Sequence, residues 1–291
     1  MALVTTPDGD ALQLREMTSR DLPAAHRLSS RVGWSHRPED WQFIFQSGQG
    51  WIAEIDGRVI GCALYWLWGE SVATVGMVIV SPDWQGKRIG FLLMSKIMSC
   101  LEGYQVRLHA TPMGKGLYQK FGFKDTGMIT QYQINPLPQL QACAIPATLS
   151  VRLAYPSDKG SLTALDTLAT GLFRPEVIGQ ILAGGIKTIV LLDKQQQITG
   201  FAACRKFGRG VVIGPVAAAN TEQAKILISQ LFSAATGLFL RIDITDNPPL
   251  AHWLEALGFT SVSIPRVMDK GRRPAEPTGC SNFAIVTQSL G

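Results

Sequence analysis

The stretch that decides the fold runs from Gly76 to Ser95 and reads G-M-V-I-V-S-P-D-W-Q-G-K-R-I-G-F-L-L-M-S. Its β-branched apolar run, Val78-Ile79-Val80, predicts a buried strand. Ser81-Pro82-Asp83 ends that strand, because proline has no N–H to give to a sheet ladder. The apolar residues from Phe91 to Ile97 follow at helical spacing. The stretch therefore predicts a strand, a turn and a helix in succession.

The turn Gln85-Gly86-Lys87-Arg88-Ile89-Gly90 has the composition of a phosphate-binding turn. The first N–H groups of a helix have no partner within it, and the helix dipole favours an anion there. Glycine allows an anion to approach the backbone closely. Lys87 and Arg88 add positive charge. An ordinary strand–turn–helix with a basic helix end is the alternative interpretation.

The segment V-x-P-x-x-Q-G-K-R-I-G resembles the acyl-CoA binding signature of GNAT-type N-acyltransferases, Q/R-x-x-G-x-G/A. Gln85 and Gly90 match the signature, and Arg88 stands where its middle glycine usually lies. The resemblance implies acetyl-CoA as co-substrate, bound by this turn and by the backbone of the preceding strand, and no metal. The implied contacts are Val78, Ile79, Val80, Gln85, Gly86, Lys87, Arg88, Ile89, Gly90 and Thr111.

A second signature begins at Thr111 and reads T-P-M-G-K-G-L-Y-Q-K-F-G-F. It resembles the GNAT segment in which a tyrosine, four residues before Gly-Phe, faces the thioester sulfur. That position is Tyr118 in this chain. A phenol near the sulfur can donate a hydrogen bond or a proton to the leaving thiolate. The alternative for Tyr118 is a core tyrosine on a short helix.

An amine acceptor is protonated at neutral pH, so the reaction needs a group that takes its proton. The candidates are Glu54, Glu70 and His109, and a water relay is the alternative. His109 lies on the strand before Tyr118, where related sequences often carry an acid. A histidine near its ordinary pKa can serve as a base.

The aromatic residues of the first half suggest an acceptor site. Trp34 and His36 lie in the predicted loop between the first two helices, where GNAT proteins often place acceptor contacts. Trp66 and Trp68 are expected to face outward from one strand, and aromatic faces attract cations. In the second half, Asp243 is expected near a strand end, to receive a cationic substrate or to cap a helix. Ordinary core and surface aromatics are the alternative.

The expected order of elements is strand, two helices, three strands, helix, strand, helix, strand, which is α/β and resembles the GNAT fold. The second half repeats landmarks of the first at nearly constant offsets, a pattern typical of a duplicated domain. The pairs are Leu12 and Leu149 (offset 137), Gly61 and Gly200 (139), and Gly122 and Gly258 (136). We therefore expect tandem GNAT-like domains, each with a mixed, mostly antiparallel sheet flanked by helices.

The expected domains are residues 1–134 for acyl-CoA binding and catalysis and residues 148–291 for a degenerate copy that shapes the acceptor site. Residues 135–147 contain three prolines and read as a linker. The second copy has no Q-x-x-G turn before its helix at Thr221. We therefore expect one CoA site in the chain.

Composition fits this interpretation. Hydrophobic residues make up 46% and charged residues 17%, which indicates well-filled cores. The net charge of +5 suits an anionic ligand, but the basic residues are scattered, so no nucleic-acid partner is expected. The five cysteines form no C-x-x-C pair, which favours a reducing compartment. No apolar run is long enough to span a membrane and residues 1–10 have no apolar segment, so a cytoplasmic location without membrane contact is expected.

The sequence thus predicts a cytoplasmic N-acetyltransferase that moves an acetyl group from acetyl-CoA to a small-molecule or protein amine. The amine attacks the thioester directly, and Tyr118 assists departure of the thiolate. The alternative is a non-catalytic protein that binds or senses acyl-CoA. Tyr118 favours the enzyme, whereas Arg88 in the signature favours the alternative.

Overall fold

The computed structural model describes residues 2–5, 9, 11–271 and 279–291, which form two compact units. The first unit contains the described residues up to Asp125 and the segment that begins at Met268. The second contains Thr126–Val267 and most of the C-terminal segment. The domain boundaries expected at residues 134 and 148 stay a prediction. The compact units differ from these boundaries in two segments. Residues 126–134 belong to the second unit, and residues 268–271 belong to the first.

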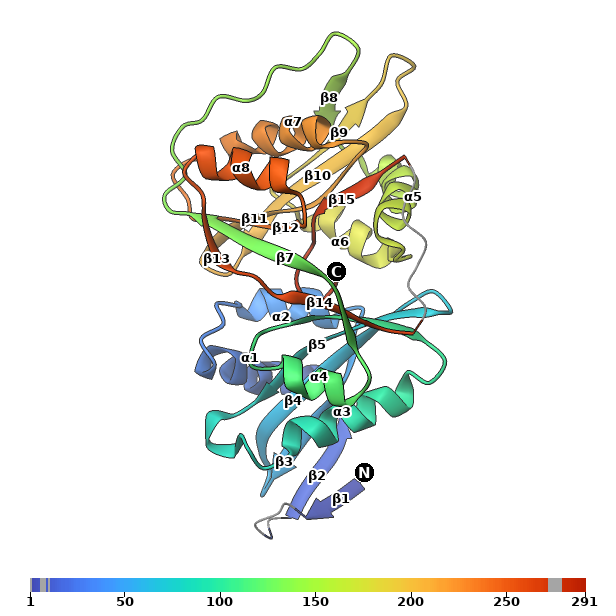
Figure 1. The fold of residues 1–291 in the computed structure, drawn as a ribbon, viewed down its shortest axis with the longest axis vertical. Helices are drawn as coiled ribbons and strands as arrows, with labels where there is room; N and C mark the ends of the chain where they lie inside the picture. The colour runs from blue at the N-terminus through green and yellow to red at the C-terminus, as the bar shows by residue number, and fades with distance from the viewer. Residues whose placement is uncertain (1, 6–8, 10, 272–278) are drawn as a thin grey trace. The chain divides into compact units, whose positions relative to one another are not determined.

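The first unit is a sheet with helices on both faces. Its strands are β1 (Ala2–Thr5), β2 (Ala11–Glu16), β3 (Gln49–Ile55), β4 (Arg58–Trp68), β5 (Val72–Val80), β6 (Gln105–Ala110) and β14 (Arg266–Lys270), in that order across the sheet (Figure 1). Its helices are α1 (Leu22–Arg31), α2 (Pro38–Phe45), α3 (Ile89–Cys100) and α4 (Lys115–Lys120), with 3₁₀ turns η1 (Ser19–Asp21) and η2 (Pro82–Trp84). Strands β1 to β5 are antiparallel neighbours, and β6 runs parallel to β5.

The two faces of this sheet follow from the alternation of side chains along β4. Ala63 and Tyr65 point toward the face covered by α3, where they share a core with Leu93. Trp66 points to the other face, where its indole N–H donates to the carbonyl oxygen of Ile44 on α2. Both faces of β4 are therefore buried, which matches its nearly continuous apolar sequence.

Strand β14 completes the first unit from a distant part of the sequence. The side chain of Met268 is fully buried in the core beneath α3, with Val106 and Leu108 of β6. Asp269 forms an ion pair with Arg107 of β6. A segment of the second half of the chain therefore supplies both core and polar contacts to the first unit.

The second unit repeats the pattern. Its strands are β7 (Lys124–Ile134), β8 (Ser150–Leu153), β9 (Lys187–Leu192), β10 (Ile198–Phe207), β11 (Gly210–Ala218), β12 (Leu240–Thr245), β13 (Thr260–Ser263) and β15 (Ser281–Ala284). Its helices are α5 (Lys159–Thr170), α6 (Pro175–Gly184), α7 (Thr221–Leu231) and α8 (Pro248–Ala256), with 3₁₀ turns η3 (Pro156–Asp158) and η4 (Phe232–Ala234). The strand order is β8-β9-β10-β11-β15-β12-β7, and β13 pairs with β7.

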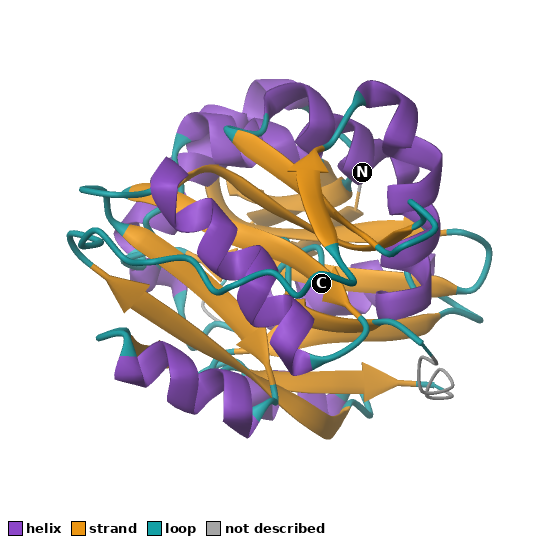
Figure 2. Cartoon of the chain, turned by 90° about the horizontal axis from the view of Figure 1, so that it is seen from above, coloured by secondary structure: helices purple, strands orange, loops and turns teal. Residues whose placement is uncertain are grey.

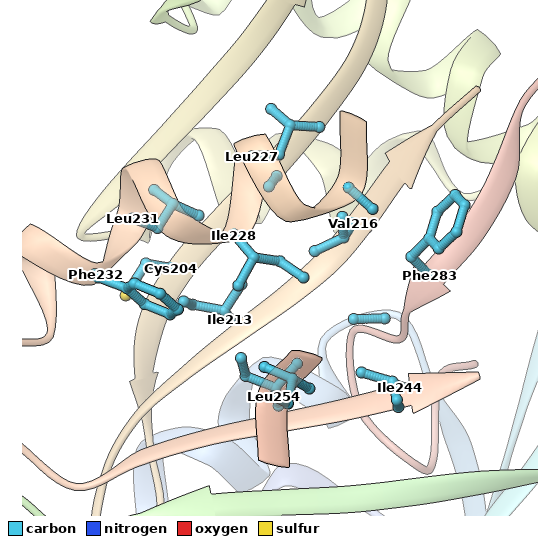
Figure 3. Packing of buried hydrophobic residues seen from close by; sticks show 14 of the residues in the cluster. Cys204, Ile213, Val216, Leu227, Ile228, Leu231, Phe232, Ile244, Leu254 and Phe283 are labelled. Atoms are coloured by element: carbon cyan, nitrogen blue, oxygen red, sulfur yellow. The ribbon is translucent and has the colours of Figure 1, made fainter. Parts of the chain in front are cut away.

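The main core of the second unit lies between α7, α8 and the sheet. Figure 3 shows Ile228 of α7 and Phe232 beside Ile213 of β11 in this core. All three side chains are almost fully buried. Helices α7 and α8 pack in this core, and α5 and α6 pack in a second core against the same strands. Figure 2 shows helices on both sides of strands.

The expected duplication and the expected fold class are confirmed. Arg15 pairs with Asp21 at the start of the first unit, and Arg152 pairs with Asp158 in the second. Both residues shift by the same amount, since 152 − 15 and 158 − 21 are each 137. Each unit is a mixed, mostly antiparallel sheet flanked by helices. Within the described ranges, no helix is long and apolar enough to cross a membrane.

Candidate active site

Strands β5 and β6 separate halfway along their length. Their parallel ladder runs from Val72–Gln105 to Val75–Leu108, and no further pair joins them in the described chain. On its other side, β5 stays paired with β4 as far as Gly61–Val80. The edge of β5 that faces β6 is therefore open, in that residues 76–80 have no strand partner on it in the described chain. An open strand edge presents backbone N–H and C=O groups to a ligand.

A bulge in β5 marks the point of separation. Leu64 pairs with Gly76 and Cys62 pairs with Ile79, so two residues of β5 lie opposite the single residue Ala63. One of the two is Met77, whose φ is +52°. Such a conformation costs about 1–3 kcal/mol for a residue with a side chain. Bulges bend a strand and increase its twist, which accounts for the divergence from β6.

The chain that leaves β5 is fixed by hydrogen bonds. The Ser81 N–H donates to the carbonyl oxygen of Ile60 at 2.8 Å. The Arg31 guanidinium donates to the Ser81 hydroxyl and to the Asp83 carboxylate, both at 2.9 Å. The amide of Gln85 donates to the carbonyl oxygen of Val80 at 3.1 Å. These bonds hold the end of β5 and the following turn in one arrangement.

The turn from Gln85 to Arg88 contains two left-handed residues and leads directly into a helix. Gly86 has φ +80° and Arg88 has φ +62°, both left-handed. Helix α3 begins at the next residue, and no side chain caps its N-terminus. Its first N–H groups therefore have no partner within the helix and suit an anion. Arg88 occupies the position of the signature's middle glycine and has a left-handed backbone, which glycine adopts freely.

Helix α4 packs against the first turn of α3. A Cβ atom built on Gly90 would lie 3.5 Å from Leu117 Cδ2 and 3.8 Å from Val80 Cγ2. The end of β5, the start of α3 and helix α4 therefore meet at Gly90, where a larger side chain would crowd all three. Tyr118 follows Leu117 directly, so the predicted acid lies one residue along the chain from this contact.

The phenol of Tyr118 stays protonated at neutral pH. Its side chain is 9% exposed and lies edge-on to Phe123, with ring centroids 6.2 Å apart. Burial raises the pKa of Tyr118 to about 12. Its hydroxyl has no hydrogen-bond partner among the described residues. A buried, protonated phenol with an uncommitted O–H suits a hydrogen-bond donor and not a base.

His109 and Tyr118 lie on different faces of β6. Leu108 and Ala110 point toward the α3 face, where they share a core with Tyr118. Side chains alternate along a strand, so His109 between them points toward the opposite face. Arg107 points the same way and is held by Asp269. The structure therefore does not bring the two predicted catalytic side chains together on one face.

Thr111 and Glu54 both have structural partners. The hydroxyl and the carbonyl oxygen of Thr111 each accept a hydrogen bond from the Gly114 N–H, which stabilises the start of α4. The carboxylate of Glu54 accepts two hydrogen bonds from Arg15, at 2.8 and 3.0 Å. Arg15 also binds Asp21, so Glu54 belongs to a three-residue ionic cluster.

The outward orientation expected for Trp66 and Trp68 is wrong. The two side chains are 1% and 3% exposed. Trp66 donates to the Ile44 carbonyl oxygen, and Trp68 donates to the Thr74 hydroxyl. The two residues do share one face of β4, but α1 and α2 cover that face. Trp66 therefore packs in the core and does not line an acceptor site.

The predicted loop between α1 and α2 does carry clustered aromatic residues. The ring centroids of Trp34 and His36 are 5.7 Å apart, and those of His36 and Trp41 are 6.4 Å apart. His26 Nε2 hydrogen-bonds the carbonyl oxygen of His36 at 2.9 Å. Trp34 remains partly exposed. This loop offers an aromatic surface on an ordered backbone.

Asp243 lies inside β12 of the second unit and is 2% exposed. Its carboxylate accepts hydrogen bonds from Arg241, two residues earlier on the same face. The amide of Gln288 lies 3.4 Å from the same carboxylate. The negative charge is thus already compensated within the second unit.

Two features of the site were missed in the sequence. The clamp of Arg31 on Ser81 and Asp83 joins residues about 50 positions apart, and no local pattern indicates it. The bulge at Met77 was missed because methionine carries no preference for a left-handed backbone. A glycine beside it, Gly76, was the available signal of irregular strand geometry.

Comparisons with known proteins agree with this architecture. Two sequence models, both described as acetyltransferase (GNAT) domains, match residues 46–125 and 162–280. A Bacillus subtilis (strain 168) protein, the uncharacterized N-acetyltransferase YitH, is 24% identical over 269 residues, covering 91% of this chain and 93% of that protein.

Solved structures give the same result for the fold. A putative acetyltransferase from Pyrococcus horikoshii superposes with a TM-score of 0.78 at 18% identity, covering 96% of each chain. A tandem GNAT protein from the clavulanic acid biosynthesis pathway gives 0.65 at 14% identity, covering 91% of this chain and 100% of that one. The sequence models and the fold define the class of protein as the GNAT acetyltransferases. The chain belongs to the GNAT family and carries two GNAT domains in tandem.

Proposed function

We propose that this protein is an acetyl-CoA-dependent N-acetyltransferase whose first unit holds the co-substrate and performs the transfer. One observation carries the proposal. The open edge of β5 leads directly into a left-handed turn and an uncapped helix N-terminus. A thioester arm with amide groups and a pyrophosphate needs these two surfaces side by side.

The residues divide between the two parts of the co-substrate. The backbone of Val78, Ile79 and Val80 binds the pantetheine amides and the thioester. Residues 85–90 bind the pyrophosphate, with Lys87 and Arg88 supplying charge and the N–H groups of α3 supplying donors. The Gln85 side chain, which bonds the Val80 carbonyl oxygen, orders the junction between the two parts.

The transfer forms one bond and breaks another. The amine nitrogen attacks the carbonyl carbon of the thioester, the new C–N bond forms, and the C–S bond breaks. Tyr118 donates its phenolic hydrogen to the departing sulfur, which leaves as a thiol. Burial raises the pKa of Tyr118 to about 12, so the phenol carries its proton at neutral pH and can serve as the donor, although the shift does not make it a stronger acid. The phenol regains its proton from solvent.

The amine loses one proton on entry and another after attack. We propose that His109 or a water relay accepts them, since His109 is the histidine nearest in sequence to the open end of β6. Trp34 and His36 are the proposed contacts of the acceptor amine. Their aromatic rings suit an acceptor that arrives with positive charge. The acceptor class is a small-molecule or protein amine.

A thiol-release assay with acetyl-CoA and a panel of amines tests the proposal. Release of free thiol that depends on an amine supports the enzyme. Saturable binding of acetyl-CoA by calorimetry, without release on any amine of the panel, would instead support the non-catalytic acyl-CoA-binding protein. A matched sample with the Tyr118→Phe variant separates enzymatic release from slow hydrolysis in buffer.

A further inference from the structure

In the second unit, β11 and β12 separate as β5 and β6 do in the first, and we call the space between the separated strands the second slot. Its parallel ladder between β11 and β12 runs from Val211–Leu240 to Ile213–Ile242, after which the two strands pair no further with each other in the described chain. On β10, Cys204 pairs with Ile213 and Ala202 pairs with Val216, so Ala203 lies opposite two residues. The second unit therefore repeats both the bulge and the strand separation of the first.

The bulge aligns the two units residue by residue. Ile213 corresponds to Gly76 and Val216 to Ile79, and both differences, 213 − 76 and 216 − 79, are 137. This is the offset found for the duplicated ion pairs. Val216, Ala217 and Ala218 therefore stand where Ile79, Val80 and Ser81 stand in the first unit.

Strand β15 fills the second slot. Its backbone pairs antiparallel with that edge of β11, Ala284 with Val216, Asn282 with Ala217 and Ser281 with Ala218. On its other side, Ala284 also pairs with Ile244 of β12, and the Ile285 N–H donates to the Asp243 carbonyl oxygen at 3.0 Å. Figure 3 shows Phe283 on β15 beside Val216 of β11. The chain thus bridges both separated strands.

The segment is held closely. A Cβ atom on Gly214 would collide with the carbonyl oxygen of Ile285, so the backbone of this segment runs directly against β11. Arg205 donates to the Val286 carbonyl oxygen at 2.5 Å, and Arg174, fully buried, donates to that of Gly291 at 2.6 Å. Breaking such buried, charge-assisted bonds leaves a polar donor buried without an acceptor and is costly.

The helix end beside the slot is also occupied by the chain itself. The side chain of Asn220 caps α7 by accepting a hydrogen bond from the Gln223 N–H at 3.0 Å. In the first unit, Arg88 holds the equivalent place and no side chain caps α3. The second unit therefore satisfies with its own groups both surfaces that stay open in the first.

We propose that residues 281–286 occupy, in the second unit, the slot that the pantetheine of acyl-CoA takes in the first. This assignment rests on the proposed function of the first unit. Pantetheine presents amide groups that can bond an open strand edge, and β15 presents the same groups from a peptide. The second slot is thus a binding site for extended main chain, and the tail of the protein is its permanent ligand.

Hydrogen exchange on the full chain, with and without saturating acetyl-CoA, tests this assignment. Without ligand, the amides of residues 281–286 are expected to exchange at least roughly 10³-fold more slowly than an unstructured chain, as core strands do. Acetyl-CoA is expected to slow exchange in residues 76–92 and to leave residues 281–286 unchanged. Fast exchange of 281–286 without ligand, or faster exchange there on adding acetyl-CoA, would overturn the assignment.

Different results would contradict the proposed function and the proposed filled slot. If acetyl-CoA slows no amide in residues 76–92 while residues 281–286 stay protected, the proposed function fails and the filled slot stands. A variant pair adds an independent measurement. Ala284→Pro removes the N–H and is expected to speed exchange at residues 216–218, whereas Ala284→Gly keeps the N–H and is not. Equal exchange at 216–218 in both variants would count against pairing by β15.

Discussion

The guanidinium of Arg107 on β6 makes two hydrogen bonds to the carboxylate of Asp269 on β14, at 2.8 and 3.2 Å, although 162 residues separate them in the sequence. Met268, the neighbour of Asp269, is fully buried in the core under α3. The unit that carries the proposed active site is therefore completed by a strand made near the end of the chain. Its stability depends on residues outside the first half.

Met268→Ala is expected to destabilise the first unit by about 2–5 kcal/mol, because it removes a fully buried side chain and leaves a cavity. Six of the seven tryptophans belong to the first unit, so their fluorescence reports its unfolding in urea. The matched control is Val262→Ala, which shortens a side chain that is 51% exposed. A midpoint equally unchanged in both variants would mean that β14 adds nothing to this core.

Gly86→Asp combined with Gly90→Asp is expected to abolish acetyl-CoA binding. The first change forces a side chain onto φ +80°, and the second adds bulk that meets Leu117. Both place negative charge where the pyrophosphate is proposed to bind. Calorimetry measures the affinity, and Gly160→Asp, near the start of α5 in open space, is the control for charge alone. A folded double variant that binds normally would refute the proposed pyrophosphate site.

Arg88 allows backbone strain and charge to be separated. A left-handed conformation costs a residue with a side chain about 1–2 kcal/mol, and glycine adopts it freely. Arg88→Gly is therefore expected to be more stable than Arg88→Ala by roughly 1 kcal/mol in thermal or urea unfolding. Both variants lose the same cation, so both should bind acetyl-CoA up to about fivefold more weakly. Equal stability of the two would show that the strain at residue 88 is relieved by other means.

Local sequence signals predicted much of the fold of the first unit, including the strand, turn and helix of the candidate site. Three signals each determine the backbone conformation close to them in the sequence: the β-branched run at residues 78–80, the proline that ends it and the glycines of the turn. Their effect can therefore be predicted from a short stretch of sequence. The signature position of Arg88 could not be assigned a conformation from residue type, since arginine disfavours φ +62°. The surrounding fold imposes it.

The features that sequence did not predict depend on distant chain. Alternation along β4 gives the faces of Trp66 and Trp68, but only the packing of α1 and α2 makes that face an interior one. The insertion of β14 beside β6 and of β15 between β11 and β12 depends on strand pairing across long separations. Such pairing leaves no periodic pattern in either partner.

One acetyl-CoA is expected to bind per chain. The slot of the second unit is filled by β15, and Asn220 caps its helix, so neither of its two surfaces is open. Calorimetry with a counted active fraction gives the stoichiometry. In the double variant at Gly86 and Gly90, all binding heat should disappear. A second equivalent of ligand, or heat that survives in that variant, would show a working site in the second unit.

Tyr118→Phe provides the sharpest test of the proposed chemistry. The change removes the hydroxyl and keeps the ring beside Phe123, so the fold should survive. If the hydroxyl assists departure of the thiolate, the maximal rate should fall by roughly 10²–10⁴, the usual scale of general acid catalysis. The affinity for acetyl-CoA should change little, because the bond matters chiefly in the transition state. Tyr155→Phe, on a 55% exposed side chain of the second unit, is the matched control.

The pH dependence gives the same prediction a second measurement. Burial raises the pKa of Tyr118 to about 12, so its donor form persists through neutral pH and is lost only as the pH approaches 12. The folded state favours the protonated phenol. The contribution of this group to the free energy of unfolding is therefore fully present below about pH 10 and declines as the pH rises above that value. Wild type should therefore lose more stability above pH 10 than Tyr118→Phe does. A variant with full turnover would make Tyr118 a core residue, and one with normal turnover but weak binding would make it an acetyl-CoA contact.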